Sequence, residues 1–274
     1  MHVPGCSHYL CTPHFPHAHI MQEKTFRYFL QIAYRGTPYS GWQKQQNAVT
    51  VQGVFESWLS KILKSNVQVV GSSRTDAGVH AQQQFAHVDL ACTVAVDHLQ
   101  YRLNAVLPKD IAVLAIRPVS STTHARFDAL ARTYVYTITQ QKTPFQYDTS
   151  FFFNNSLDIS KMNEGAKILC RKQDFRNLCK IRSSDVHFLC TIMKATWSVR
   201  QGQLTFCIRA NRFLRGMVRV IVSLLLRVGQ KKVSLSDFEA LIDAKERNPV
   251  ACLVPARGLT LMQVTYPKAI FLTQ

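Results

Sequence analysis

Acidic residues are scarce in this chain, and it has no long apolar run. Its 274 residues include 16 Asp and Glu against 33 Lys and Arg, which gives a formal net charge of +17. The longest apolar candidate, residues 213–228, is interrupted by Arg215, Arg219 and Arg227. It therefore falls short of the roughly 18 uninterrupted apolar residues that a membrane-spanning helix needs. We expect a soluble protein with no membrane partner.

Two signatures of metal and nucleotide chemistry are missing as well. The eight cysteines include no Cys-x-x-Cys pair, and no glycine-rich nucleotide-binding motif is present. Several cysteines lie within apolar segments, as reduced core thiols do. We therefore expect a cytoplasmic location, no cofactor and no catalytic metal.

The N-terminal segment has an unusual composition. Its first 20 residues contain no Lys, Arg, Asp or Glu, but hold five of the ten histidines and two of the cysteines. Pro and His interrupt every apolar stretch, which argues against a signal peptide. A metal site formed by Cys6, His8, Cys11 and His14 is one interpretation, and a disordered tail is the other. The irregular spacing and the lack of a second ligand cluster favour a disordered tail over residues 1–24.

Positive charge is concentrated in one part of the chain. Residues 171–232 contain fourteen Lys and Arg but only two Asp. Self-repulsion opposes such a one-sided charge unless a polyanion compensates it. A nucleic acid backbone is the common polyanionic partner, and no amphipathic helix with an aromatic-rich face points to an acidic membrane instead.

Hydrophobic periodicity divides residues 25–122 into six elements in the order β-α-β-β-α-β. The predicted strands are residues 25–34, 67–70, 84–90 and 111–119, and the predicted helices begin after Thr50 and at Asp97.

Residues 123–274 show the same order with one extra helix. The predicted strands are residues 134–139, 193–199, 204–210 and 259–266. The predicted helices are 156–170, with Asp158 as its cap, 212–228 and 236–244. We therefore predict an α+β protein made of two ferredoxin-like β-α-β-β-α-β halves, with antiparallel-rich sheets and a catalytic cleft between them.

One loop between two predicted strands carries Arg74-Thr75-Asp76-Ala77-Gly78-Val79-His80. Asp followed by Ala-Gly is typical of a turn, because Asp can bond its own backbone and Gly permits positive φ. A turn does not require the arginine, however, and a carboxylate on a loop held by two strands is a common way to present a nucleophile. The residues alone leave both interpretations open.

Five ordered segments make the chain resemble the tRNA pseudouridine synthase A family. They are the Asp76 loop, residues 33–43 (AYRGTPYSGWQ), residues 125–136 with ARFDA and RTYVY, residues 213–219 (FLRGMVR) and residues 255–259 (PARGL). Each is weak alone, but together they span nearly the whole chain after its first 25 residues.

The resemblance implies a catalytic role for Asp76, Tyr134 and Arg219. Asp76 would be the nucleophile, Tyr134 an aromatic residue packed on the target base, and Arg219 the partner of Asp76. Pseudouridine formation breaks the C1′–N1 bond of uridine and rejoins the uracil through C5, without redox chemistry. A carboxylate in a dry pocket keeps its charge when a cation lies within about 4–6 Å, which is consistent with these roles.

The resemblance also implies the substrate and its contacts. The substrate would be the anticodon stem-loop of tRNA, modified at uridines 38, 39 and 40, and the protein would be a homodimer. The implied substrate contacts are Arg74, Tyr134, His124, Arg126, Lys180, Arg182 and Leu259. A pseudouridine synthase that acts on other RNA and a non-catalytic RNA-binding protein are the alternatives.

Overall fold

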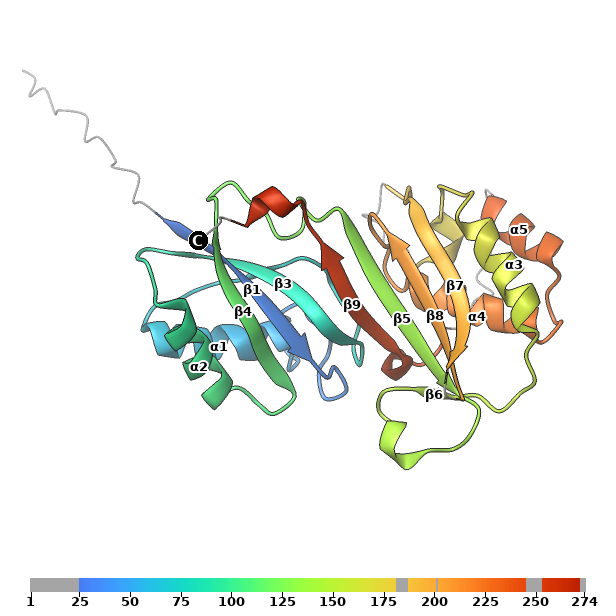
Figure 1. Cartoon of the computed structure of the whole chain (residues 1–274), viewed down its shortest axis with the longest axis horizontal. Helices are drawn as coiled ribbons and strands as arrows, with labels where there is room; N and C mark the ends of the chain where they lie inside the picture. Colours follow the sequence, from blue (N-terminus) through green and yellow to red (C-terminus); the bar gives the residue numbers. More distant parts are fainter. Residues whose placement is uncertain (1–24, 181–186, 201, 245–252, 272–274) are drawn as a thin grey trace, which may run out of the picture.

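The computed structural model describes residues 25–180, 187–200, 202–244 and 253–271. In this part of the chain, the strands form one mostly antiparallel sheet flanked by five α-helices (Figure 1). The protein is thus α+β, as predicted. The expected tail, residues 1–24, and its alternative metal site lie outside the described residues, and so does Arg182.

The elements follow one another from β1 to β9. The strands are β1 (Phe26–Tyr34), β2 (Val70–Gly71), β3 (His80–Leu90), β4 (Ile111–Val119), β5 (Ala131–Thr139), β6 (Phe151–Phe152), β7 (Ile192–Arg200), β8 (Gln203–Ala210) and β9 (Leu259–Thr265). The α-helices are α1 (Val51–Leu63), α2 (Val96–Val106), α3 (Ile159–Leu169), α4 (Met217–Gly229) and α5 (Leu235–Asp243).

The sheet has the strand order β4-β1-β3-β9-β5-β8-β7. The last strand, β9, therefore lies between β3 and β5 in the middle of the sheet. It pairs with β3 in parallel over only two residue pairs, His80 with Thr260 and Ala81 with Leu261. Its antiparallel pairing with β5 is longer, so β9 joins the strands that precede residue 122 to those that follow it.

Helix caps and apolar faces place the helices against the sheet. Thr50 and Asp158 accept hydrogen bonds from the first turns of α1 and α3, which confirms both predicted caps. α1 and α2 lie beside β1, β3 and β4, whereas α3, α4 and α5 lie near β7 and β8 (Figure 1). α4 is the most apolar of them and is mostly buried. No helix in the described residues has the length and hydropathy of a membrane span.

The predicted strand at residues 67–70 is largely wrong. Only Val70 and Gly71 pair with β3. The backbone amide of Val67 donates to the Ser60 hydroxyl at 3.2 Å, and that of Val69 donates to the Glu56 carboxylate at 3.0 Å. The amides of Val67 and Val69 therefore donate to side chains of α1 and not to the carbonyls of a neighbouring strand.

Two other predicted boundaries differ from the structure. The helix expected at residues 212–228 begins only at Met217, because Gly216 has a φ of +67° and ends the preceding loop. Arg212 and Arg215 thus lie before the helix and do not share a helical face with Arg219. In addition, β3 begins at His80, so the strand starts directly after the Asp76 turn.

Candidate active site

The loop that carries Asp76 is a tight turn between β2 and β3. The Val79 amide donates to the Asp76 carbonyl at 3.1 Å, and Gly78 has a φ of +77°, which favours glycine. The predicted turn at Asp76-Ala77-Gly78 is therefore confirmed. The Asp76 side chain remains 27% exposed, so the turn leaves its carboxylate accessible to a ligand.

A second loop, residues 36–42, packs on the Asp76 turn. The Trp42 amide donates to the Thr75 carbonyl at 3.2 Å. Gly41 approaches the turn closely, because a Cβ atom there would lie 2.4 Å from the Thr75 carbonyl oxygen, and its φ is +89°. Only glycine satisfies both conditions without a shift of the backbone.

Buried side chains hold the first residues of the turn. The Tyr34 and Thr75 hydroxyls are hydrogen-bonded at 2.8 Å. Gln84 donates to the Ser73 carbonyl at 2.8 Å and accepts from the Ser72 hydroxyl at 2.6 Å. Burial raises the pKa of Tyr34, so its hydroxyl remains protonated. Hydrogen bonds thus hold both the side chains and the backbone at the start of the turn.

Helix α4 brings Arg219 to this turn. Its Nη1 atom lies 3.2 Å from the Asp76 Oδ2 atom, and its Nε atom donates to the Val254 carbonyl at 2.8 Å. The Arg219 side chain is only 16% exposed. The ion pair expected from the sequence is therefore present, and it joins two residues 143 positions apart.

Tyr134 on β5 lies beside the same ion pair. Its ring is buried and meets the Phe213 ring edge-on, with 5.2 Å between centroids. Burial raises the pKa of Tyr134 to about 12; the Arg132 guanidinium opposes this rise and the Asp76 carboxylate adds to it. Tyr134 is therefore near enough to Asp76 to feel its charge, and the tyrosine hydroxyl is protonated at neutral pH.

Arg132 is a site residue that sequence reasoning missed. It is 8% exposed, and its guanidinium donates only to backbone carbonyls, those of Ala129 (2.9 Å), Asn211 (2.8 Å), Ser72 (3.1 Å) and Arg126 (2.6 Å). These carbonyls belong to the segment that leads into the Asp76 turn, to residues 125–129 and to the loop before α4. Arg132 therefore ties together the three segments that surround Asp76. Its position two residues before Tyr134 is the only signal that the sequence offers.

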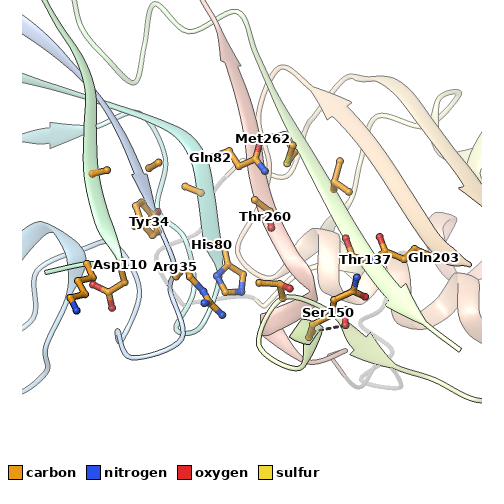
Figure 2. A pocket seen from close by; sticks show the side chains of 17 residues that line it. Tyr34, Arg35, His80, Gln82, Asp110, Thr137, Ser150, Gln203, Thr260 and Met262 are labelled. Carbon is orange, nitrogen blue, oxygen red and sulfur yellow. Dashed lines mark hydrogen bonds between the residues drawn. The ribbon is translucent and has the colours of Figure 1, made fainter. Parts of the chain in front are cut away.

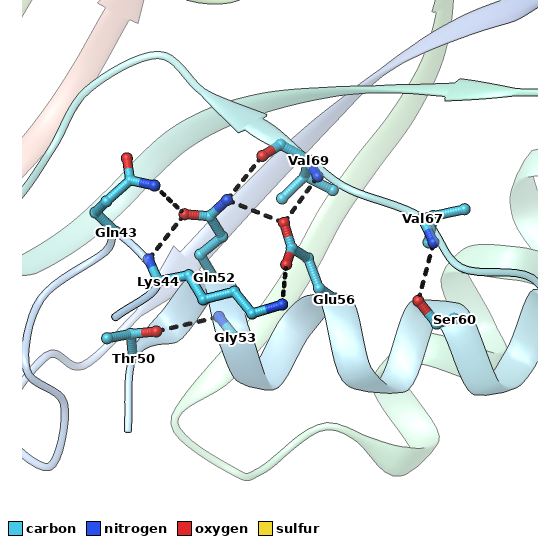
Figure 3. Close-up of polar contacts among 9 residues, drawn as sticks. All are labelled: Gln43, Lys44, Thr50, Gln52, Gly53, Glu56, Ser60, Val67 and Val69. Atoms are coloured by element: carbon cyan, nitrogen blue, oxygen red, sulfur yellow. Dashed lines mark hydrogen bonds and ion pairs between the residues drawn. The ribbon is translucent and has the colours of Figure 1, made fainter. Parts of the chain in front are cut away.

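A buried network on α1 supports the neighbouring loops (Figure 3). Gln52 accepts from the Lys44 amide and the Gln43 side chain, and donates to the Val69 carbonyl, each at 2.9 Å. Glu56 accepts from Gln52 and Val69 and pairs with the Lys44 ammonium at 3.1 Å. Both loops that flank the Asp76 turn are therefore anchored to one helix.

The other predicted substrate contacts differ in exposure and in the elements that carry them. Arg74, Arg126 and Lys180 are exposed, and His124 is half-buried. The Lys180 amide donates to the Arg215 carbonyl at 2.8 Å, which places Lys180 at the start of α4. Leu259 is buried at the start of β9, opposite Tyr136. Their roles as RNA contacts stay predictions.

A separate cavity of about 780 Å³ lies along β3, β9 and β5 (Figure 2). Its lining includes Tyr34, Arg35, His80, Thr137 and Gln203, but not Asp76, Arg219 or Tyr134. Burial lowers the pKa of His80, whose ring accepts from the Gly36 amide and bonds the Arg257 carbonyl. His80 is therefore a structural link, and this cavity is not where Asp76 would meet a substrate.

The chemical groups around Asp76 suit reactions of a carboxylate. A guanidinium orients Asp76, a protonated phenol lies beside it, and both are largely buried. In the described ranges, no three His, Cys, Asp or Glu side chains gather closely enough to hold a metal ion.

Comparison with known proteins agrees with this geometry. The family described as tRNA pseudouridine synthase matches residues 31–128 and 166–267, which include both Asp76 and Arg219. A protein of Porphyromonas gingivalis named tRNA pseudouridine synthase A is 43% identical, over 90% of this chain and 99% of its own. The chain belongs to the tRNA pseudouridine synthase family.

Other members of the tRNA pseudouridine synthase family show the same extent of similarity. A protein of the same name from Azobacteroides pseudotrichonymphae is 42% identical, over 89% of this chain and 98% of its own. Another, from Exiguobacterium sibiricum, is 34% identical over 89% of this chain and 98% of its own. The similarity to the family therefore covers both sides of the ion pair.

Proposed function

We propose that this protein isomerises uridine to pseudouridine in tRNA, with Asp76 as the nucleophile. The observation that carries the proposal is the Asp76–Arg219 ion pair, which lies beside Tyr134 in a chain of this family. In the reaction the C1′–N1 bond of the target uridine breaks, and a C1′–C5 bond forms. N1 gains a proton and C5 loses one, so no atom or electron is lost overall.

Each residue of the site has a distinct role in this proposal. Arg219 pairs with the Asp76 carboxylate and aims it, since a half-buried charge needs a paired cation. Tyr134 offers an aromatic face to the extruded uracil, and base–aromatic contacts of this kind contribute about 1–3 kcal/mol. Because its pKa is raised to about 12, Tyr134 also keeps a hydroxyl proton that it can donate to the base.

The proposal extends to the anticodon stem-loop, at uridines just 3′ of the anticodon, and to a homodimer that holds one tRNA with both subunits. The concentration of Lys and Arg in residues 171–232 supports a large phosphate-bearing partner. The substrate contacts in this proposal are Arg74, Tyr134, His124, Arg126, Lys180, Arg182 and Leu259.

We also infer that the chain consists of two ferredoxin-like halves, residues 25–122 and 123–274. The strand order supports this. With the two-residue strand β6 left out, β4-β1-β3-β2 and β9-β5-β8-β7 repeat one arrangement of fourth, first, third and second strand. Asp76 belongs to the first half and Arg219 to the second, so the site lies between them. The thiols of Cys92, Cys170, Cys190 and Cys207 are unbridged, which supports a cytoplasmic location.

The test of this function compares three proteins on a tRNA transcript and measures tRNA affinity alongside pseudouridine formation. The wild-type protein is expected to form pseudouridine, whereas Asp76→Asn and Arg219→Ala lose turnover and keep most of their affinity. Binding without product by the wild type would favour the non-catalytic alternative. Turnover by Asp76→Asn would contradict the role of Asp76, and wild-type-like turnover by Arg219→Ala would contradict the role of the pair.

A further inference from the structure

Phe127 is 75% exposed, although the turn that carries it is firmly bonded. The His124 amide donates to the Asp128 carboxylate at 2.7 Å, and the Asp128 amide donates back to the His124 carbonyl at 3.1 Å. The His124 Nδ1 atom accepts from the amides of Arg126 and Phe127. A single exposed apolar side chain is ordinary, so the meaning of Phe127 depends on what surrounds it.

Phe127 ends a row of three aromatic rings. The His124 ring lies 4.3 Å from the Phe127 ring, centroid to centroid, and the His87 ring lies 4.7 Å from the His124 ring. Burial and the nearby Arg27 lower the pKa of His124, so its ring is mostly neutral at neutral pH. The His124 and Phe127 ring planes are inclined by 36°, so the row ends in the exposed, uncharged ring of Phe127.

Three arginines surround this surface. Arg126 lies over the Phe127 ring, with 5.8 Å between the guanidinium carbon and the centroid. The Arg132 guanidinium donates to the carbonyls of Arg126, Ser72 and Asn211, so the segments that carry Arg74 and Arg212 lie next to Arg126. In agreement with this, burial and then the charges of Arg74 and Arg212 lower the pKa of Arg126. None of them forms an ion pair with a carboxylate within the described residues. Unpaired like charges held together favour a polyanionic ligand.

This surface adjoins the catalytic turn. One nitrogen of Arg132, Nη2, donates to both the Ser72 and the Arg126 carbonyl. This nitrogen therefore bridges the backbone of the residue before Phe127 and the segment that leads into the Asp76 turn.

We propose that the Phe127 and His124 rings form a stacking platform for the nucleobase next to the target uridine, and that Arg74, Arg126 and Arg212 bind the phosphates on either side. This rests on the proposed function of the site. A uridine that leaves its stack deprives its neighbour of a stacking face. An aromatic side chain at that position replaces the lost face and holds the RNA open.

Stacking is tested by fluorescence, which needs no turnover. The fluorescence of 2-aminopurine falls when the base stacks, so it is placed on either side of the target uridine and, as a control, in the distal stem. The RNA is bound to Asp76→Asn protein with Phe127 or with Phe127→Ala. The expected result is quenching at one neighbouring position that depends on Phe127, and none in the stem. Equal quenching by both proteins at every position would overturn the platform.

Kinetics provide the second test, with matched variants. Phe127→Ala is expected to lower kcat/KM for pseudouridine formation roughly 5- to 150-fold, Phe127→Tyr to retain most of it, and Phe127→Leu to remain low. Phe145→Ala removes a ring that is 100% exposed elsewhere and is expected to change nothing, and all four variants should keep the melting temperature. If Phe127→Leu matched the wild type, apolar bulk would suffice and stacking would be wrong.

The arginines are tested by the salt dependence of binding. Arg212→Ala is expected to weaken RNA binding for every sequence and to lower the log–log salt slope by about 1. Arg102→Ala, which removes an exposed charge from α2, is the control and should leave the slope unchanged. An unchanged slope for Arg212→Ala would remove Arg212 from the proposed phosphate contacts. If the wild type formed no pseudouridine, the proposed function would fail, while fluorescence and salt slope would still decide the platform.

Discussion

Arg132 and Arg219 differ in the groups that their guanidinium groups bind. Arg219 pairs with a carboxylate, whereas Arg132 donates to four carbonyls from three segments. Within the described residues, no carboxylate pairs with Arg132. A guanidinium can serve this purpose because its donors form a rigid planar fork. Arg132 is therefore a positioning residue for the catalytic turn.

Replacing Arg132 with Met is expected to lower both stability and turnover. Four buried or partly buried carbonyls would lose their donor, and the free energy of unfolding should fall by about 2–4 kcal/mol. Because the Asp76 turn loses an anchor, kcat should fall while KM for tRNA changes little. Urea unfolding and steady-state kinetics measure the two effects. Arg132→Lys should restore only part of each, and full activity of the Met variant would contradict the positioning role.

His87 makes the fold sensitive to acid. Its Nδ1 atom accepts from the Ala125 amide at 3.1 Å, and burial, followed by the charge of Arg27, lowers its pKa from 6.5 to about 4. In the unfolded chain His87 binds a proton near pH 6.5, whereas the folded protein resists this proton until about pH 4. The contribution of neutral His87 to the free energy of unfolding is thus complete above pH 6.5 and is lost as the pH falls toward 4.

We expect the melting temperature to fall between pH 6.5 and 4, and to fall less in His87→Gln. Gln can accept from the Ala125 amide without taking up a proton. Thermal unfolding of both proteins across this pH range makes the comparison. Identical pH profiles would show that His87 does not cause the acid sensitivity.

At the scale of elements, the site depends on loops that approach each other closely. The loop of residues 36–42 meets the Asp76 turn at Gly41, where there is no space for a Cβ atom. The turn in the β7–β8 hairpin offers a contrast, since Gly202 also has a positive φ, of +74°, but a Cβ atom there would meet nothing within 4 Å. A substitution at Gly202 would therefore cause backbone strain alone, whereas one at Gly41 would cause both strain and a steric clash.

Gly41→Ala is therefore expected to be more harmful than Gly202→Ala. Both substitutions place a Cβ in the left-handed region, at a cost of about 1–2 kcal/mol. Only Gly41→Ala also pushes on the Thr75 carbonyl, so it alone should reduce pseudouridine formation. Unfolding and activity assays on the two variants decide this, and equal activity losses would show that the loop contact does not matter.

Local signals in the sequence identified most elements but not all of their partners. Thr50 and Asp158 were identifiable as caps because the bond they make lies within three residues. Val67 and Val69 looked like strand residues, yet the side chains that bond them belong to a helix before them. The carbonyls that Arg132 binds carry no residue-type signal and lie up to 79 positions away. The pairing of Asp76 with Arg219 was accessible only through resemblance to a family.

At the scale of the whole molecule, β9 holds the sheet together. It lies between β3 and β5, and the segment before it supplies the Val254 carbonyl that binds Arg219. Among the described residues, the strands β1–β4 and β5–β8 are therefore joined only by their pairing with β9. Stability and the catalytic site should therefore be lost together when β9 is removed.

A chain that ends before Leu259 is expected to lose cooperative unfolding and all pseudouridine formation, because β3 and β5 would each expose an unpaired edge. A chain that ends after Phe271 keeps β9 and is the control, with wild-type unfolding and activity expected. Circular dichroism on heating and the tRNA assay compare the two. A cooperative transition in the shorter chain would mean that β9 is dispensable.

The central place of β9 also matters while the protein is being made. A ribosome that has synthesised Asp76, Tyr134 and Arg219 has not yet produced the strand that brings their segments together. The nascent chain therefore carries its positive charge before it has a working catalytic centre. We therefore expect activity only after β9, Leu259–Thr265, has been synthesised, and we expect an interrupted product without β9 to keep its positive charge but lack the assembled site.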